Sequence, residues 1–440
     1  MPLDVIFILD KLNENCFEAY IVGGCVRDYL LGNTPNDYDI TTSARPDEIK
    51  EVFKDFKTIL VGEAYGTVAV IINGISYEIT TFRIDGKYLN NRKPESVEFS
   101  DNLLEDLKRR DFTINAMAMD RNKNLYDPFN GKKDLAEEII RAVGNPYERL
   151  REDAIRILRA IRFSGRFDFY LEEDLHEAIS NERELLKNIS VERIFDEFKA
   201  MITADNPSKY LLLMEETGVL TVLFPELKRT IGFNQHTPFH DKTLFDHLVL
   251  TTDFVKGDLA LRLAALFHDI SKVDTFSIGE DGRGHFYGHE IYGAELSEKI
   301  LKRYKASNKI IEKVKILISD HMKVHSEMTD KALRRQIKRV GRENVLDLYD
   351  LMIADCMATR TDRDASFIIK RKNRVKELLE EKEMKSNKFL EIDGNTIKSL
   401  GFQEGKIIGK ILKDLEEIVY DDPSKNNKEY LTLYIKENYR

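Results

Sequence analysis

The chain has few cysteines and no long hydrophobic run. Its 440 residues include three cysteines, Cys16, Cys25 and Cys356, which lie far apart and lack the spacing of metal ligands. This set argues against a disulfide framework and fits a reducing compartment, so we expect a cytoplasmic protein. No apolar run approaches the ~20 residues that span a bilayer. The first four residues lack the basic region that starts a signal peptide. We therefore expect no membrane association.

The chain also lacks a strong charge of one sign. It carries 68 basic and 77 acidic residues, a formal net charge of −9, and 42% of its residues are hydrophobic. A negative total argues against broad, nonspecific binding to nucleic acid, but it allows local basic faces. At ~100–200 residues a domain, this length and hydrophobic content predict a globular protein of about two to four domains.

Near its start the chain has a glycine pair followed by two closely spaced carboxylates. Gly23 and Gly24 would let backbone amides approach a polyphosphate closely, and Arg27 would add a charged fork. Asp37 and Asp39 point the same way if their segment is extended, because side chains alternate along a strand. Two such carboxylates can hold two Mg²⁺ ions roughly 3.5–4 Å apart, which activates an attacking hydroxyl and stabilises leaving pyrophosphate. The combination predicts nucleotidyl transfer.

A β-hairpin is predicted shortly after these motifs. Residues 67–72 and 75–79 read as strands joined by Asn73-Gly74, a pair typical of a type I′ turn. Glu78 lies on the second strand, which would place it beside the two aspartates as a third catalytic carboxylate. A structural glutamate at the edge of the core is the alternative.

Strand signals, including one at residues 19–22, are confined to the first part of the chain. From about residue 132 onward, Leu, Ile, Glu, Lys and Arg dominate at helical spacing. The sequence therefore predicts an α+β protein, with a small N-terminal mixed β-sheet head followed by a long all-helical neck, body and tail. We place these domains at residues 1–135, 136–205, 206–375 and 376–440. Within the head, the polar segment 83–99 is expected to be a mobile loop.

Four further motifs follow the first two in order. They are Arg109 to Ala116, Asp127 to Leu135, Glu152 to Phe163 and Glu192 to Glu197. Together, all six resemble the class II tRNA nucleotidyltransferases, the CCA-adding enzymes, densely over residues 18 to about 200 and more loosely in the tail. The resemblance implies Mg²⁺ as cofactor, a nucleotidyltransferase head, and the tRNA 3′ end, CTP and ATP as substrates. Nothing in the sequence identifies a protein partner.

The resemblance also implies individual roles. Asp37 and Asp39 match metal ligands. Nucleotide contacts are implied for Gly24, Arg27, Arg110, Asp153, Arg156, Arg159 and Arg162. To these we add Gly23, from the backbone argument, and Asp111, whose carboxylate would bond a ribose hydroxyl.

Asp153 and Arg156 offer a physical means of choosing the base. On their pairing edge, cytosine and adenine both present an amine donor beside a ring-nitrogen acceptor, and uracil and guanine reverse this pattern. A carboxylate accepting from the amine and a guanidinium donating to the ring nitrogen would select C and A together. Two residues three apart on a helix point about 60° from each other and can read one base edge. The alternative is an ordinary helix salt bridge. Arg162 is half a turn away and would reach phosphates, the tRNA end or a neighbouring acid.

A second site is predicted in the body. The segment of about 240–360 holds seven of the nine histidines, and the runs 267–272 and 289–295 resemble the HD-domain metal-phosphohydrolase signature, with Ser271 where that family usually has glycine. Imidazole and carboxylate together suit a divalent transition metal or a mixed pair of metals. The expected ligands are His247, His268, Asp269, His289, His321 and Asp355. The domain would hydrolyse phosphomonoesters or 2′,3′-cyclic phosphates, or serve as a structural spacer.

Residues 331–342 contain six basic and no acidic side chains. Their spacing of three and four would put all six on one helical stripe. The stripe is either a solvated helix face or a track for RNA phosphates, which would make binding salt-sensitive. Its members are Lys331, Arg334, Arg335, Lys338, Arg339 and Arg342.

Several other functions stay open. A bacterial poly(A) polymerase would share the head, but such enzymes carry basic residues after a glycine near residues 61–67, and none occurs there. A CC-adding enzyme would differ mainly in the polar segment, which here keeps the full-function pattern Arg83, Asp85, Gly86, Tyr88, Arg92 and Pro94. A metal-dependent phosphohydrolase with a vestigial head and a non-catalytic RNA-binding protein are further alternatives.

Overall fold

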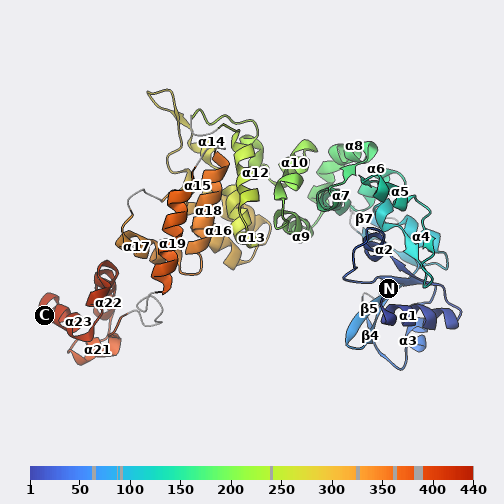
Figure 1. Ribbon diagram of the computed structural model, residues 1–440, viewed down its shortest axis with the longest axis horizontal. Helices are drawn as coiled ribbons and strands as arrows, with labels where there is room; N and C mark the ends of the chain where they lie inside the picture. The colour runs from blue at the N-terminus through green and yellow to red at the C-terminus, as the bar shows by residue number, and fades with distance from the viewer. Residues whose placement is uncertain are drawn as a thin grey trace. The chain divides into compact units, whose positions relative to one another are not determined.

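The computed structural model describes residues 1–61, 66–86, 88–89, 93–237, 241–323, 328–359, 364–380 and 390–439. Contacts divide the chain into two units, Met1–Lys228 and Arg229–Arg440. This division falls inside the predicted body 206–375, and the bounds of the four predicted domains stay predictions. The predicted α+β class, a mixed N-terminal sheet followed by helices, is confirmed (Figure 1).

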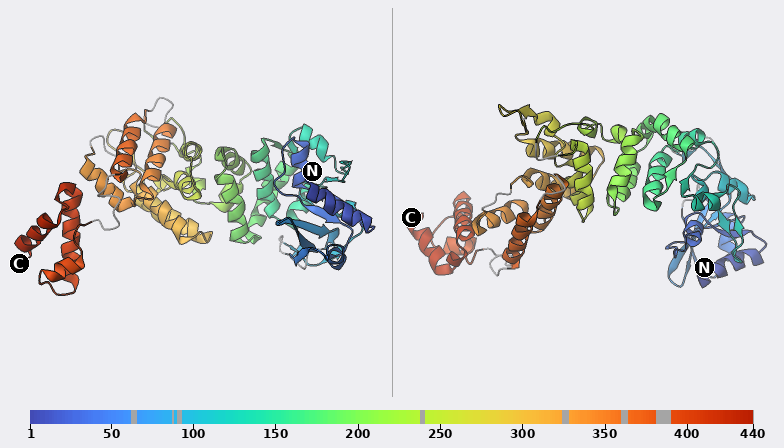
Figure 2. Two further views of the ribbon diagram at one scale, coloured as in Figure 1. Left: turned by 60° about the horizontal axis from the view of Figure 1, so that its bottom comes forward. Right: turned by 45° about the horizontal axis from the view of Figure 1, so that its top comes forward.

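The first unit is built on a mixed sheet with the strand order β11-β10-β1-β2-β5-β4-β3. β2 and β5 are parallel and the other neighbours are antiparallel. The strands are β1 (Ala19–Val22), β2 (Ile40–Thr42), β3 (Lys57–Leu60), β4 (Thr67–Ile72), β5 (Ile75–Thr81), β10 (Ala118–Met119) and β11 (Leu125–Tyr126). α1 (Leu3–Glu14) and α3 (Pro46–Val52) contact each other and the sheet (Figure 2).

The predicted strand and hairpin of the head are confirmed. β1 covers residues 19–22, and β4 and β5 flank Asn73 and Gly74, whose φ values are 51° and 81°. Positive φ at both turn residues is the type I′ geometry, which Asn-Gly adopts at little cost. Alternate residues of β4 and β5 such as Val68, Val70 and Ile79 are fully buried, which fixes the register of the hairpin.

The polar segment 83–99 is a β-ribbon over its described residues, which corrects the expected loop. β6 (Arg83–Asp85) pairs antiparallel with β9 (Val97–Phe99), and β7 (Tyr88–Leu89) with β8 (Lys93–Pro94). The segment forms strands although it is polar, because strand pairing uses backbone hydrogen bonds, which polar side chains do not prevent. The structure does not describe Lys87 or Arg92 of this segment. It also does not describe residues 62–65, which belong to the segment that was compared with poly(A) polymerases.

The rest of the first unit is mainly helical. It contains α2 (Gly24–Leu30), α4 (Leu103–Lys108), η2 (Thr113–Asn115), α5 (Gly131–Ala136), β12 (Ile139–Ile140), α6 (Pro146–Glu152), α7 (Ile155–Phe167), β13 (Tyr170–Leu171), α8 (Glu173–Glu182), η3 (Arg183–Asn188), α9 (Val191–Ile202), α10 (Pro207–Glu216) and α11 (Val219–Leu223), with η4 (Leu227–Thr230) at the unit boundary. α7 packs on α9 and α10, and its buried face includes Ile157, Leu158 and Ile161. This face explains why the cationic α7 sequence still folds as a helix.

The described residues of the second unit are helical apart from one short hairpin. Its elements are α12 (Leu244–Phe254), α13 (Leu259–Phe267), α14 (Lys272–Thr275), β14 (Ser277–Ile278), β15 (Gly284–His285), α15 (His289–Arg303), α16 (Asn308–Asp320), α17 (Asp330–Val340), α18 (Val345–Thr359), α19 (Ser366–Glu380), α21 (Gly394–Ser399), α22 (Lys406–Asp421), η5 (Pro423–Lys425) and α23 (Lys428–Asn438). The last helices have their own hydrophobic core around Ile397, Ile411 and Leu431. No helix in the described parts of the chain is long and apolar enough to cross a membrane.

Candidate active site and metal centre

The glycine pair forms a turn between β1 and α2. Gly23 has φ of 77° and ψ of −128°, a conformation that favours glycine, and its amide donates to the Met117 carbonyl (3.1 Å). A Cβ on Gly23 would lie 3.0 Å from Arg110 Nη1, so glycine also makes room for this guanidinium. The turn and Arg110 therefore lie together, as a phosphate site requires.

Asp37 and Asp39 directly precede β2, and both are exposed. Asp39 reaches solvent, but its surroundings partly dehydrate the carboxyl, and this is the largest effect that raises its pKa. The charge of Arg110 lowers the pKa of Asp39, and the charge of Asp37 raises it. The two carboxylates are thus close enough to repel each other, and a cation between them would relieve that repulsion. This donor set fits Mg²⁺, which prefers carboxylate oxygens.

Glu78 lies on β5, the neighbour of β2 in the sheet. Ile40 is opposite Ile79 in this parallel pair, so Glu78 comes at the level of Asp39. Its side chain is exposed. The predicted placement beside the aspartates is supported by this register, and its catalytic role stays a prediction.

Arg27 is buried, with 4% of its surface exposed. Its guanidinium donates to Asp28 Oδ1 (2.8 and 2.9 Å) and to Asn115 Oδ1 (2.6 Å), and it lies 4.6 Å from the ring centre of Phe167. Burial lowers its pKa, and the hydrogen bond and charge of Asp28 oppose this effect. In this structure Arg27 braces the glycine turn against α7 and η2, and a phosphate contact would require it to change partners.

Asp111 binds protein groups with both carboxyl oxygens. Oδ2 accepts from Arg159 Nε and Nη2 (2.8 and 2.6 Å), and Oδ1 accepts from the Phe112 amide and from Asn115 Nδ2. Burial favours its protonated form, but the charge and hydrogen bonds of Arg159 outweigh this and hold the pKa of Asp111 below its ordinary value. The predicted ribose contact therefore competes with an ion pair that ties the head to α7.

Asp153 and Arg156 are not on one continuous helix, which corrects the geometry of the sequence argument. α6 ends at Glu152, Asp153 is extended (φ −135°, ψ 101°), and α7 begins at Ile155. Asp153 accepts two hydrogen bonds from Arg193 of α9 (3.2 and 2.8 Å).

Arg156 is buried at the start of α7. Its Nη1 donates to Glu152 Oε2 (2.6 Å) and the Arg149 carbonyl, and its Nη2 donates to the Arg109 carbonyl (2.9 Å). The two residues still lie at one chain junction, where an extended residue can turn its carboxylate independently of the helix.

Arg162 contacts a neighbouring acid, which is one of the three partners that the sequence predicted for it. Its Nε donates to Glu197 Oε2 (2.5 Å), and Arg159 Nη1 lies 4.0 Å from Glu197 Oε1. Arg193 and Glu197 belong to the motif at 192–197, but sequence reasoning gave them no role. A cation and an acid four apart on α9, facing the cationic α7, were the available signal.

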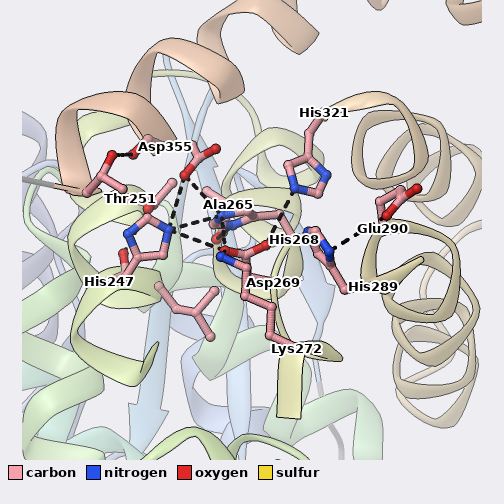
Figure 3. Close-up of polar contacts among 12 residues, drawn as sticks. His247, Thr251, Ala265, His268, Asp269, Lys272, His289, Glu290, His321 and Asp355 are labelled. Atoms are coloured by element: carbon pink, nitrogen blue, oxygen red, sulfur yellow. Dashed lines mark hydrogen bonds and ion pairs between the residues drawn. The ribbon is translucent and has the colours of Figure 1, made fainter. Parts of the chain in front are cut away.

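In the second unit all six predicted ligands converge (Figure 3). His247 comes from α12, His268 and Asp269 follow α13, His289 begins α15, His321 follows α16 and Asp355 lies on α18. They form two groups that share Asp269, and within each group one ligand atom per residue lies within 4.8 Å of the others. The groups are His247, His268, Asp269, Asp355 and Asp269, His289, His321.

Backbone carbonyls fix the orientation of three of these histidines. The Nδ1 atoms of His268, His289 and His321 lie 2.9, 2.6 and 2.6 Å from the carbonyl oxygens of the residues three positions earlier. A proton on each Nδ1 leaves the Nε2 lone pair directed at the carboxylates, the arrangement in which imidazole binds a metal.

The charges of this cluster also fit a cation. Burial lowers the pKa of His268, but Asp269 and Asp355 raise it further, to about 10. Burial also opposes ionisation of Asp269 and Asp355, yet the surrounding imidazoles, and Lys272 at Asp269, hold both pKa values well below the ordinary range.

Three buried atoms, Asp269 Oδ1, His289 Nε2 and His321 Nε2, make no hydrogen bond among the described residues, and they belong to one group. Unbonded lone pairs that converge in this way fit a metal ion.

The basic segment 331–342 does not put all six cations on one helical stripe, which corrects that expectation for Arg342, while the other five lie on α17 at the predicted spacings. α17 ends at Val340 because Gly341 has φ of 92°, so Arg342 lies beyond the helix. Lys338 lies 3.2 Å from Glu416 and Arg335 lies 3.6 Å from Glu417, both on α22.

Arg339 instead donates to Asp320 of α16 (2.9 Å). The cations thus face different partners within the chain, because acids distant in sequence were invisible to a local pattern. RNA binding by this segment stays a prediction.

Comparison with known proteins gives family matches over the head and over the segment that carries the six-residue cluster. Residues 19–141 match the family "Poly A polymerase head domain", residues 168–231 match "Probable RNA and SrmB- binding site of polymerase A", and residues 247–360 match "HD domain". The chain is therefore a nucleotidyltransferase with an HD domain.

Relatives along the full length narrow this class. A CCA-adding enzyme of Staphylococcus haemolyticus is 33% identical over 98% of this chain and 96% of its own length, and one of Ligilactobacillus salivarius is 36% identical over 96% and 93%. The crystal structure of Bacillus stearothermophilus CCA-adding enzyme in complex with CTP has a TM-score of 0.74 at 28% identity, covering 98% of this chain and 96% of that one. The chain belongs to the CCA-adding enzyme family.

Proposed function

We propose that this protein adds the sequence CCA to the 3′ end of tRNA, using CTP and ATP. The observation that carries this proposal is family membership over the whole chain, including similarity to an enzyme whose crystal structure contains CTP. The test is extension of tRNA lacking its last three nucleotides, with an Asp37→Ala/Asp39→Ala variant as control.

The geometry of the head supports two-metal nucleotidyl transfer. Two Mg²⁺ ions held by Asp37 and Asp39 would lower the pKa of the primer 3′-hydroxyl and neutralise the triphosphate, so that the 3′-oxygen bonds to the α-phosphorus as the bond to the β-phosphate breaks and pyrophosphate leaves. Arg110 lies beside Gly23, and its charge lowers the pKa of Asp39. Its guanidinium would contact the triphosphate. Glu78 would extend the carboxylate set from the adjacent strand.

The protein template is proposed for Asp153 and Arg156. Asp153 is held by Arg193, which orients its carboxylate without burying it, and Arg156 lies at the adjoining start of α7. Reading a base requires Arg156 to exchange a partner, and Glu152, its acidic partner, is half-buried. We further propose that the helical body and the tail hold the tRNA.

A second activity is favoured by the convergence of the six ligands in the HD domain. We propose metal-dependent hydrolysis of a phosphoester, in which a water oxygen bonds to phosphorus, the ester P–O bond breaks and the leaving alcohol takes a proton. The cluster would hold a divalent transition metal, which supplies a nucleophilic hydroxide at neutral pH. Hydrolysis of a 2′,3′-cyclic nucleotide should persist in Asp37→Ala and be lost in His268→Ala and Asp269→Ala. Its retention in both HD variants would refute this assignment.

A further inference from the structure

The mixed sheet of the first unit has one covered face and one open face. Val68 and Val70 of β4 and Tyr77 of β5 are buried. The Tyr77 hydroxyl donates to Asp4 of α1 (3.3 Å), and α3 contacts both β4 and β5. α1 and α3 therefore cover the face to which these side chains point. Because side chains alternate along a strand, the residues between them point to the opposite, open face.

The strand register lines up one row of the open face with the two aspartates. Asp39 comes at the level of Glu78 of β5. Glu78 is opposite Ala69 of β4, and Ala69 is opposite Ile59 of β3, the last strand of the sheet. With neighbouring strands about 4.7–4.9 Å apart, Ile59 lies roughly 14–15 Å from Asp39. The open face thus extends from the proposed metal ligands to the edge of the sheet.

The proposed triphosphate site lies on the other side of Asp39. The strand order puts β1 on one side of β2, and β5, β4 and β3 on the other. Val22, the last residue of β1, donates its amide to the Asp39 carbonyl (3.0 Å), so the turn at Gly23 begins directly beside Asp39. Arg110 lies at the same turn. Asp39 therefore separates the triphosphate site from Glu78 and the open face.

This arrangement sets the direction from which the RNA approaches. In an in-line displacement the attacking oxygen and the leaving pyrophosphate lie on opposite sides of the phosphorus. With the phosphates on the β1 side, the 3′-oxygen of the RNA approaches from the side of β5, β4 and β3. The nucleotides that precede this oxygen then lie over the open face.

The side chains of the open face suit single-stranded RNA. Ile59 is 45% exposed and Val61, directly after β3, is 41% exposed. On an edge strand such apolar side chains mark a place where another molecule binds. Lys57, two residues before Ile59 on the same face, is exposed and would hold a phosphate. Nearer to Glu78, the hydroxyl oxygens of Thr67 and Thr80 lie 3.0 Å apart.

We propose that the open face of β5, β4 and β3 holds the single-stranded 3′ end of the RNA that is extended. Ile59 and Val61 contact its bases or riboses, and Lys57 contacts a phosphate of its backbone. The inference rests on the nucleotidyl transfer proposed for the head, and it adds the surface along which the RNA reaches the two aspartates.

Equilibrium binding without CTP tests this surface separately from transfer. The probes are a tRNA that ends in CC and the same tRNA trimmed back to its double-stranded stem. Ile59→Asp should weaken binding of the first about tenfold, the lower end of what burial of an isoleucine contributes, and leave the second unchanged. Lys57→Gln should also weaken the first and reduce the slope of log Kd against log salt by about 1. In turnover, both variants should raise the KM for tRNA and leave the KM for CTP unchanged.

Ile75→Asp and Lys54→Gln are the matched controls. Ile75 is 55% exposed, but it lies two residues before Tyr77 on β5 and so belongs to the opposite face of the sheet. Lys54 is exposed and lies 2.9 Å from Glu51. Neither change should alter the binding of either probe.

Unchanged affinity for the CC-ending tRNA in Ile59→Asp, or an equal loss in Ile75→Asp, would overturn the proposal. So would a dimer that Ile59→Asp dissociates at unchanged tRNA affinity, because a second copy of this chain would then cover the face. Ile59-dependent binding by a chain that adds no nucleotide would refute the transferase and leave the RNA surface standing. Normal CCA addition with unaffected tRNA binding in Ile59→Asp would refute the surface alone.

Discussion

At the scale of single residues, the two exposed aspartates before β2 are the proposed metal ligands of the head. Partial burial, and to a smaller extent the charge of Asp37, raise the pKa of Asp39, so the two carboxylates are close enough to share a cation. We predict that Asp37→Asn or Asp39→Asn lowers the rate of nucleotide addition by at least about a thousandfold, because the loss of a charge-stabilising group at the reacting centre costs several kcal/mol. Quenched-flow measurement of CTP addition checks this. A reduction of less than tenfold in both variants would contradict the metal-ligand role.

The base template makes a different prediction at the same scale. Asp153→Ala should relax selection against UTP and GTP more than it weakens triphosphate binding, because the acceptor for the amine is lost and the phosphate contacts remain. Competition between CTP and UTP on one tRNA measures the selection. Arg193→Ala is the companion variant, since it frees the Asp153 carboxylate without removing it. Unchanged preference in Asp153→Ala would refute the template.

Asp111 gives a prediction about acid stability. Its folded-state pKa is depressed by Arg159, so the ion pair stabilises the fold above the ordinary carboxyl pKa of about 3.9 and is lost as pH falls through the folded-state value. At pH 7, Asp111→Asn should reduce the stability of the first unit by about 3 kcal/mol, since it takes from the partly buried Arg159 its main partner and leaves only the more distant Glu197. The difference from the wild type should shrink below pH 4, as followed by urea unfolding. A difference that grows there would contradict the assignment.

At the scale of elements, sequence reasoning succeeded where the pattern is local. The Asn73-Gly74 hairpin follows from turn chemistry and alternation, and the histidines of the HD domain follow from short motifs. It was wrong where the local structure depends on a partner distant in sequence or on the point at which a helix ends. The junction at Asp153, the end of α17 at Gly341 and the pairing of β6 with β9 depend on contacts or backbone angles that no local window shows.

The contact between α17 and α22 yields a test that separates two roles of the basic segment. Lys338 and Arg335 lie beside Glu416 and Glu417, so charge reversal should disturb the docking of α22. If RNA is the main partner, Arg335→Glu/Lys338→Glu raises the KM for tRNA severalfold and leaves the KM for CTP unchanged. Adding Glu416→Lys/Glu417→Lys restores the KM for tRNA only if the segment acts through the tail. Exposed pairs are worth at most about 1 kcal/mol each, so the fold should survive these changes.

At the scale of the whole molecule, the two sites lie in different units of the chain. The sequence alone predicted both sites, because each has dense motifs, but it left their working partners Arg193, Glu197 and Lys272 without roles. Only the folded structure identifies these residues, through the contacts of Arg193 with Asp153, of Glu197 with Arg162 and of Lys272 with Asp269.

The separation of the units predicts independent loss of function. His268→Ala should reduce the bound metal, measured by elemental analysis after dialysis, because it removes one member of a buried ligand group. Addition of CTP to tRNA by the same variant should stay within about twofold of the wild type. A parallel loss of both would show that the HD cluster supports the transferase fold.

The most direct test of the central claim is extension of tRNA lacking its last three nucleotides, resolved to single nucleotides, with CTP, ATP or both. The account predicts addition of two C residues with CTP alone and one further A when both are present, with no product from Asp37→Ala/Asp39→Ala. A product that stops after CC, a long A tail, or no extension at all would contradict the assignment of CCA addition to this chain.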